Sequence, residues 1–134
     1  MNIILCGALG RMGQAILECL SHESDLTLGA ALDMGDDIKT GITNGDSVID
    51  FTTPATTLAI LAEAVSQKKP LVIGTTGFNE EEMNLIREGS KSIPIVLSPN
   101  MSVGVNVVFR LLADAAKILK NRYYDVEIVE MHHS

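Results

Sequence analysis

The sequence predicts an α/β fold in which a doubly wound parallel sheet carries helices on both faces. Short apolar segments alternate with longer amphipathic segments along the chain, and neighbouring parallel strands need crossover connections that are usually helices. Three glycines, Gly7, Gly10 and Gly13, follow the first apolar segment, and an acidic residue, Asp33, follows the second. Together these features indicate the Rossmann type of this fold.

The first half of the chain contains signals for three strands and two helices. The apolar segments predict strands at Ile3–Cys6, Leu26–Leu32 and Val48–Phe51. The helix after the first strand should end near Ser21 and His22, with His22 as a capping residue. Thr53 followed by Pro54 predicts the start of the next helix. The polar, glycine-bearing segment Met34–Asp46 should form a loop.

The second half continues the same alternation. Apolar segments predict strands at Leu71–Ile73, Ile95–Leu97 and Val126–Val129. Asn79, with Glu82 three positions later, is typical of a capping box in front of a helix. A long helix should run from about Ser102 to Asn121, because apolar residues recur there at helical spacing. No repeat or linker interrupts this pattern.

The composition is that of a single folded domain. The 134 residues are 46% hydrophobic, which is enough for one core. The net charge of −7 argues against binding to nucleic acid or to anionic membranes. No apolar run approaches the roughly 20 residues of a membrane span, and Met1 leads into the first strand without a signal-peptide pattern. We therefore expect a cytoplasmic protein.

The glycine-rich turn is typical of a phosphate-binding site. Glycine lets the backbone bend and approach a ligand, and the free N–H groups of a helix's first turn attract an anion. Asp33 stands twenty residues after Gly13, where a carboxylate can bind a ribose hydroxyl. Alternatively, the glycine turn only packs a strand against a helix, and Asp33 is a solvated acid in a loop. The combination favours dinucleotide binding.

Two neighbouring residues bear on the choice of dinucleotide. Met34 places no cation beside Asp33 for a 2′-phosphate, which slightly favours NADH over NADPH. Arg11, in the glycine turn, either reaches that phosphate or is an exposed arginine at the start of a helix, since arginine suits both positions.

Three later motifs fall where an open parallel sheet binds its ligands, beyond the carboxyl ends of strands. The turns Gly74–Gly77 and Ser98–Met101 offer hydroxyl and amide groups, although both also read as ordinary turns. His132 and His133 follow the last expected strand, and a histidine beside a nicotinamide could donate a proton near pH 7. The alternatives are a surface histidine pair or part of a metal site, but no third ligand has suitable spacing.

The two cysteines are expected to be reduced core thiols. Cys6 lies in the first predicted strand and Cys19 on the apolar face of the helix that follows it. This placement favours buried thiols over a disulfide or a metal site.

Five motifs, in order along the whole chain, resemble one enzyme family. They are GALGRMG at 7–13, DFT at 50–52, GTTGF at 74–78, PNMSVGVN at 99–106 and EMHH at 130–133. As a set they resemble 4-hydroxy-tetrahydrodipicolinate reductase, formerly called dihydrodipicolinate reductase, of lysine and diaminopimelate biosynthesis.

The resemblance implies a role for each matching residue. The pyrophosphate of NADH or NADPH would be held by Gly7, Ala8, Leu9, Gly10, Arg11 and Met12. Asp33 would bind the adenosine ribose. The nicotinamide end would be held by Gly74, Thr75, Thr76, Ser98, Pro99, Asn100 and Met101. His132 would be the proton donor and His133 would contact the substrate, a cyclic dicarboxylate whose unsaturated ring takes a hydride as water is lost.

The chain departs from the family pattern in two ways. The family often carries arginine where Met34 stands here. The family also continues beyond its histidines with a lysine and a P-S-G-T stretch that bind the substrate carboxylates, and with a mixed sheet that builds a homotetramer. This chain ends at Ser134. We therefore expect a dinucleotide-binding domain at 1–130, the start of a substrate domain at 131–134, and a substrate and tetramerisation domain that is otherwise absent.

Such a chain should bind cofactor and show little turnover, because the cationic partners for two carboxylates are absent. Two other interpretations stay open. One is a noncatalytic dinucleotide-binding module. The other is a different oxidoreductase with the same cofactor fold, such as an aspartate dehydrogenase. The oligomeric state is open as well, because exposed apolar surface could make the chain dimeric.

Overall fold

The computed structural model describes residues 1–120, 124–125 and 127–129. Its sheet has five parallel strands in the order β2-β1-β3-β4-β5. The strands are β1 Asn2–Cys6, β2 Thr27–Leu32, β3 Ser47–Asp50, β4 Leu71–Ile73 and β5 Ile95–Leu97. The predicted parallel α/β fold and the first five predicted strands are confirmed, with boundaries within one residue.

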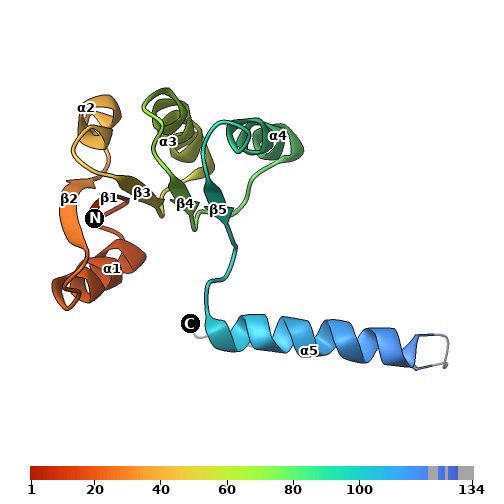
Figure 1. Ribbon diagram of the computed structural model, residues 1–134. Coiled ribbons are helices and arrows are strands. Elements are labelled where there is room, and N and C mark those ends of the chain that lie inside the picture. The colour runs from red at the N-terminus through yellow and green to blue at the C-terminus, as the bar shows by residue number, and fades with distance from the viewer. Residues whose placement is uncertain (121–123, 126, 130–134) are drawn as a thin grey trace. The chain divides into compact units, whose positions relative to one another are not determined.

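The described residues form five helices, which connect or follow these strands. They are α1 Arg11–Ser21, α2 Ile38–Ile42, α3 Pro54–Ser66, α4 Glu80–Gly89 and α5 Val103–Leu119. In Figure 1, α2, α3 and α4 lie on one face of the sheet and α1 lies on the other. The sheet is therefore doubly wound, as the sequence predicted.

The helix ends follow the expected capping chemistry. Thr53 caps α3, with Pro54 at the first helical position. Asn79 and Glu82 form the complete capping box of α4, with backbone-to-side-chain distances of 2.8 and 2.9 Å. His22 is the C-cap of α1. These predictions are confirmed because each depends only on residues adjacent in the sequence.

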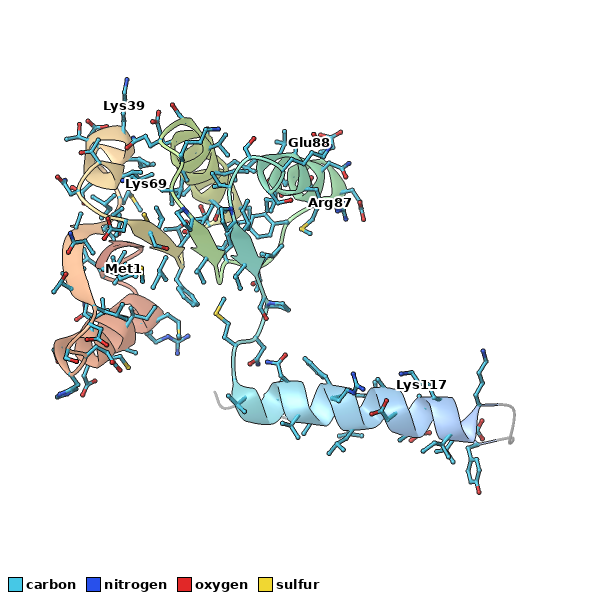
Figure 2. All side chains as sticks on the ribbon, in the orientation of Figure 1. Met1, Lys39, Lys69, Arg87, Glu88 and Lys117 are labelled. Carbon is cyan, nitrogen blue, oxygen red and sulfur yellow. The ribbon has the colours of Figure 1, made fainter. Side chains whose placement is uncertain are left out.

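The main core fills the space between the sheet and the helices α2, α3 and α4. Ile4, Val48 and Ile73 from the central strands are fully buried there, as are Ile60 and Ala64 of α3. A lysine joins the connection between α2 and β3 to the connection between α3 and β4: Lys69, labelled in Figure 2, donates from Nζ to the carbonyl of Gly45 at 2.6 Å.

The α1 side of the sheet is less completely covered. Within residues 1–99, α1 is the one helix on this face, and Val96 on the edge strand β5 is 57% exposed. Met12, in the first turn of α1, is 51% exposed. Cys19 is exposed rather than buried, so the prediction of a core thiol is wrong for Cys19 and confirmed for Cys6. Because α1 is the one helix of residues 1–99 on this side, it leaves part of this face of the sheet and part of its own surface exposed.

Two other predictions on secondary structure are wrong. The expected loop Met34–Asp46 contains the short helix α2. Asp37 is the N-cap of this helix, and its side chain accepts the N–H of Lys39 at 3.1 Å. Of the last predicted strand, Val126 lies outside the described residues and 127–129 form no strand. A strand requires a hydrogen-bonding neighbour, and no described segment pairs with these residues.

The chain divides into two compact units, Met1–Pro99 and Asn100–Ser134. The second contains α5, whose N-cap Ser102 confirms the predicted start. Asn100 accepts the N–H of Ser102 at 2.8 Å, and Asn106 donates to the carbonyls of Asn100 and Ser102. Asp114 pairs with two neighbouring cations on this helix. No described helix combines the length and apolar character needed to cross a membrane.

The C-terminus of α3 contains a strained position. Lys68 has a φ of 57°. Its N–H donates to the carbonyl of Val65 at 3.3 Å, and the N–H of Lys69 donates to the carbonyl of Ala64 at 2.9 Å. This pair of bonds is the Schellman motif, in which glycine is the usual residue at the left-handed position.

Replacing Lys68 by glycine should therefore stabilise the protein. The left-handed conformation destabilises a residue with a Cβ by about 1–2 kcal/mol. Glycine avoids this strain but loses more conformational entropy on folding, so the net gain in folding free energy is roughly 0.5–1 kcal/mol. Urea unfolding of Lys68→Gly measures the gain. Lys68→Ala is the control because it removes the lysine side chain but keeps Cβ, and equal stability of the two variants would contradict the explanation.

Candidate functional site

A cavity of about 600 Å³ opens at the carboxyl edge of the sheet, a volume within the usual range for small-molecule sites. Its walls come from the turn after β1, the end of β2 and the turn after β3. They include Gly7, Gly10, Asp33, Met34, Phe51 and Thr52. Three segments that are distant in the sequence thus meet at one edge, where parallel sheets bind their ligands.

The glycines of the first turn allow this close meeting. Gly7 has a φ of +82°, and a Cβ there would lie 2.2 Å from the carbonyl oxygen of Phe51. A Cβ at Gly13 would lie 2.2 Å from the carbonyl oxygen of Gly7. The N–H groups of Gly7 and Ala8 both donate to the carbonyl of Leu32, at 2.9 and 3.2 Å. The turn is therefore tied to β2 and pressed against the end of β3.

The first turn of α1 is free to bind an anion. Each of the other four helices has a capping side chain, namely Asp37, Thr53, Asn79 or Ser102. Gly10 is the N-cap of α1, has no side chain to cap with, and precedes a first turn without acidic residues. Among the described residues, the N–H groups of residues 11–13 have no acceptor. Such a turn attracts phosphate oxygens.

Asp33 lines the cavity and is hydrogen-bonded to the glycine turn. Its Oδ2 accepts the N–H of Leu9 at 2.7 Å, and its Oδ1 accepts the N–H of Met34 at 2.8 Å. The bond from Leu9, followed by that from Met34, lowers the pKa of the Asp33 carboxyl. Asp33 is therefore ionised at neutral pH and acts only as a hydrogen-bond acceptor.

The charges around the cavity are unfavourable for a second phosphate at the Asp33 end. Asp36 also lines the cavity, and its Oδ2 accepts the N–H of Asp33 at 2.8 Å. Met34 is 99% exposed. The described lining contains two carboxylates and neither lysine nor arginine. Arg11 is exposed in the neighbouring turn.

A buried carboxylate lies beneath the turns that follow β3 and β4. Asp50 is 0% exposed. Its Oδ1 accepts the hydroxyl of Thr52 at 2.6 Å, and its Oδ2 accepts the hydroxyls of Thr75, at 3.2 Å, and Thr57. Burial raises the pKa of Asp50, and the hydroxyl donors oppose this rise. Burial, with the added charge of Asp50, raises the pKa of the Cys6 thiol to about 12, so this thiol is unreactive.

Sequence reasoning missed several of these residues. It identified Gly7, Gly10 and Asp33, but it gave no role to Asp50 of the DFT motif, and it did not identify Asp36 or the contributions of Thr53 and Thr56 to the cavity lining. A signal for Asp50 was present, because an aspartate that ends an apolar strand in the middle of a sheet must be buried and paired.

The remaining predicted site residues lie in different parts of the structure. Gly74 and Ser98 follow neighbouring strands: Gly74 N–H donates to the carbonyl of Asp50, and Ser98 N–H donates to that of Ile73. Asn100 and Met101 belong to the second compact unit. His132 and His133 lie outside the described residues. The described part of the chain contains no cluster of three potential metal ligands.

Known proteins are similar in sequence to this chain. The family profile described as "Dihydrodipicolinate reductase, N-terminus" matches residues 1–101, and that described as "Dihydrodipicolinate reductase, C-terminus" matches residues 104–134. The 4-hydroxy-tetrahydrodipicolinate reductase of Nitrosomonas eutropha is 43% identical over 155 residues, covering 99% of this chain and 58% of that protein. The Akkermansia muciniphila enzyme of the same name is 45% identical over 133 residues, covering 99% and 54%.

A solved structure shares the fold. Dipicolinate-bound dihydrodipicolinate reductase from Paenisporosarcina sp. TG-14 matches with a TM-score of 0.70 and 22% identity, over 87% of this chain and 53% of that one. The chain spans 54–58% of the length of these curated relatives. Since a family profile covers most of the chain and the relatives match it throughout, the chain belongs to the dihydrodipicolinate reductase family.

Proposed function

We propose that the chain binds a reduced nicotinamide dinucleotide at the carboxyl edge of its sheet. The observation that carries this proposal is the uncapped first turn of α1, which begins where the glycine turn borders the cavity. The free N–H groups of residues 11–13 would donate to the pyrophosphate, together with the backbone of the turn from Gly7 to Met12. These bonds to a charged group are stronger than bonds between neutral groups.

Asp33, which follows β2 at the edge of the same cavity, would hold the adenosine ribose. Each of its carboxylate oxygens accepts one N–H group, and each has a second lone pair for a ribose hydroxyl. The bonds from Leu9 and Met34 fix the carboxylate in place before a ligand arrives. The Asp33 end of the site is therefore preorganised.

For the longer protein of this family we propose reduction of 4-hydroxy-tetrahydrodipicolinate to tetrahydrodipicolinate, a step of lysine and diaminopimelate biosynthesis. Bound NADH or NADPH would supply the hydride. His132 would donate the proton and His133 would contact the cyclic dicarboxylate, from which water is lost. Gly74–Thr76 and Ser98–Met101 would hold the nicotinamide end. The same proposal assigns a cytoplasmic location and a homotetramer to the longer protein, with no nucleic-acid or membrane partner.

We propose that the cofactor site prefers NADH to NADPH. A 2′-phosphate near Asp33 would face a second carboxylate, Asp36, and the described lining offers it no cation. Like charges in a partly enclosed site oppose binding. Arg11 is the one candidate for a compensating cation in the adjacent turn.

Capping α1 with a charged side chain should block the site. Gly10→Asp would place a carboxylate where it caps the free N–H groups, stabilising the helix by only a few tenths of a kcal/mol relative to glycine while repelling the pyrophosphate. Titration followed by NADH fluorescence should show saturable binding by the 134-residue chain and a loss of more than about tenfold in Gly10→Asp. Gly10→Ala, the control, adds Cβ without charge and should bind far better.

Two outcomes of that titration would contradict the proposal. One is the absence of NADH and NADPH binding by the unchanged chain. The other is unchanged affinity in Gly10→Asp. Repeating the titration with pyridine-2,6-dicarboxylate tests the substrate half separately: we expect the 134-residue chain to bind NADH equally well with and without it, and to show little turnover.

Introducing a cation beside Asp33 should change the cofactor preference. Met34 is 99% exposed and its hydrogen bond to Asp33 comes from its backbone N–H, so Met34→Arg should leave the fold intact. We expect it to raise NADPH affinity by about tenfold while NADH affinity changes little. Met34→Gln is the uncharged control. If the unchanged chain already prefers NADPH and loses that preference in Arg11→Ala, Arg11 binds the phosphate and the proposed NADH preference is wrong.

A further inference from the structure

The position of Asp50 in the fold requires an explanation. Asp50 is the last residue of β3, the middle strand of the sheet, and it is 0% exposed. A buried carboxylate costs folding free energy even when it is paired. Asp50 lies outside the cavity lining, so binding a ligand directly does not explain it. Its hydrogen bonds indicate what it does instead.

The donors to Asp50 come from separate elements. Thr52 is in the turn after β3, Thr75 is in the turn after β4, and Thr57 is in α3. The hydroxyl of Thr75 has a second role, because it accepts the backbone N–H of Thr52 at 2.9 Å. A hydroxyl has one proton, so accepting from Thr52 and donating to Asp50 fixes its orientation.

These bonds join the two turns to each other. The chain Thr52 N–H to Thr75 Oγ1 to Asp50 Oδ2 connects residues 23 and 25 positions apart in the sequence. Packing adds to this connection, since a Cβ at Gly74 would lie 2.1 Å from the ring of Phe51. A displacement of one turn relative to the other would break these bonds and this contact. Thr75 is 5% exposed, and the bonds of its hydroxyl to Thr52 and Asp50 both belong to this connection.

We propose that Asp50, Thr52 and Thr75, here called the Asp50 cluster, position the turns at 51–53 and 74–76 for cofactor binding. The inference rests on the proposed dinucleotide site. Phe51, Thr52 and Thr53 line the cavity, and the second turn follows the neighbouring strand. By holding both turns in one arrangement, the cluster lowers the entropy that a ligand must remove on binding. Asp50 is thus a positioning residue.

The chain offers a matched control for this proposal. Thr57 donates to the same carboxylate oxygen as Thr75 and is also buried, but it lies in α3 and contacts neither turn through its hydroxyl. Thr57→Val and Thr75→Val each remove one hydroxyl bond to Asp50. Both should lower the thermal unfolding midpoint. Only Thr75→Val also leaves the N–H of Thr52 without its acceptor.

The test is NADH fluorescence titration of the 134-residue variants well below their unfolding midpoints. We expect Thr75→Val to weaken NADH binding about tenfold and Thr57→Val to change it by less than about twofold. Thr75→Ser keeps the hydroxyl and should restore the original affinity. Asp50→Asn should weaken NADH binding as well. The double variant Asp50→Asn with Thr75→Val should bind NADH no more weakly than whichever single variant has the lower affinity, because both substitutions act through one cluster.

Each alternative gives a different result. Equal effects of Thr57→Val and Thr75→Val on affinity would show that the cluster contributes only to stability. Independent, multiplying losses in Asp50→Asn and Thr75→Val would show that the Thr75 hydroxyl contacts the cofactor itself instead of acting through Asp50. Either result overturns the proposal. If Asp50→Asn does not fold, the comparison of Thr57→Val, Thr75→Val and Thr75→Ser decides. Failure of the unchanged chain to bind NADH would instead overturn the proposed function.

Discussion

The close approach of three backbone segments at Gly7 is the constraint on which the rest of the structure depends. The carbonyl of Leu32 accepts two N–H groups from the turn, and the carbonyl of Phe51 occupies the space that a side chain at Gly7 would need. The ends of β1, β2 and β3 are thereby gathered around one cavity. The same turn leads into α1 through Gly10, which leaves the first N–H groups of that helix uncapped.

Much of the fold could be predicted from the sequence because its signals are local. The alternation of apolar strands with amphipathic helices placed five strands, and the pairing of Asn79 with Glu82 placed the start of α4. The short helix α2 could not be predicted in this way. It has five residues in a polar segment and depends on burying Ile42, which is 0% exposed, against the core. The exposure of Cys19 could not be predicted locally either, because it depends on α1 lying alone, within residues 1–99, on its face of the sheet.

The candidate site also has one part that local sequence signals predict and one part that only the fold brings together. The glycine turn and Asp33 follow from spacing, because each lies directly after a strand. The Asp50 cluster depends on β3 and β4 being neighbours, so its members come together only through the sheet. The turn at 74–76 was predicted from its hydroxyls as a direct ligand site. The structure shows the Thr75 hydroxyl bonded to Asp50 and Thr52, and the role of this turn in binding a ligand stays a prediction.

The central claim is that the free first turn of α1 holds the pyrophosphate of a dinucleotide. Backbone amide NMR of the 134-residue chain during titration with NADH tests it most directly. We predict that the amide signals of Arg11, Met12 and Gly13 shift with one saturation curve, while those of the capped first turn of α4 stay in place. Saturable NADH binding that leaves the three α1 amides unchanged would contradict the account.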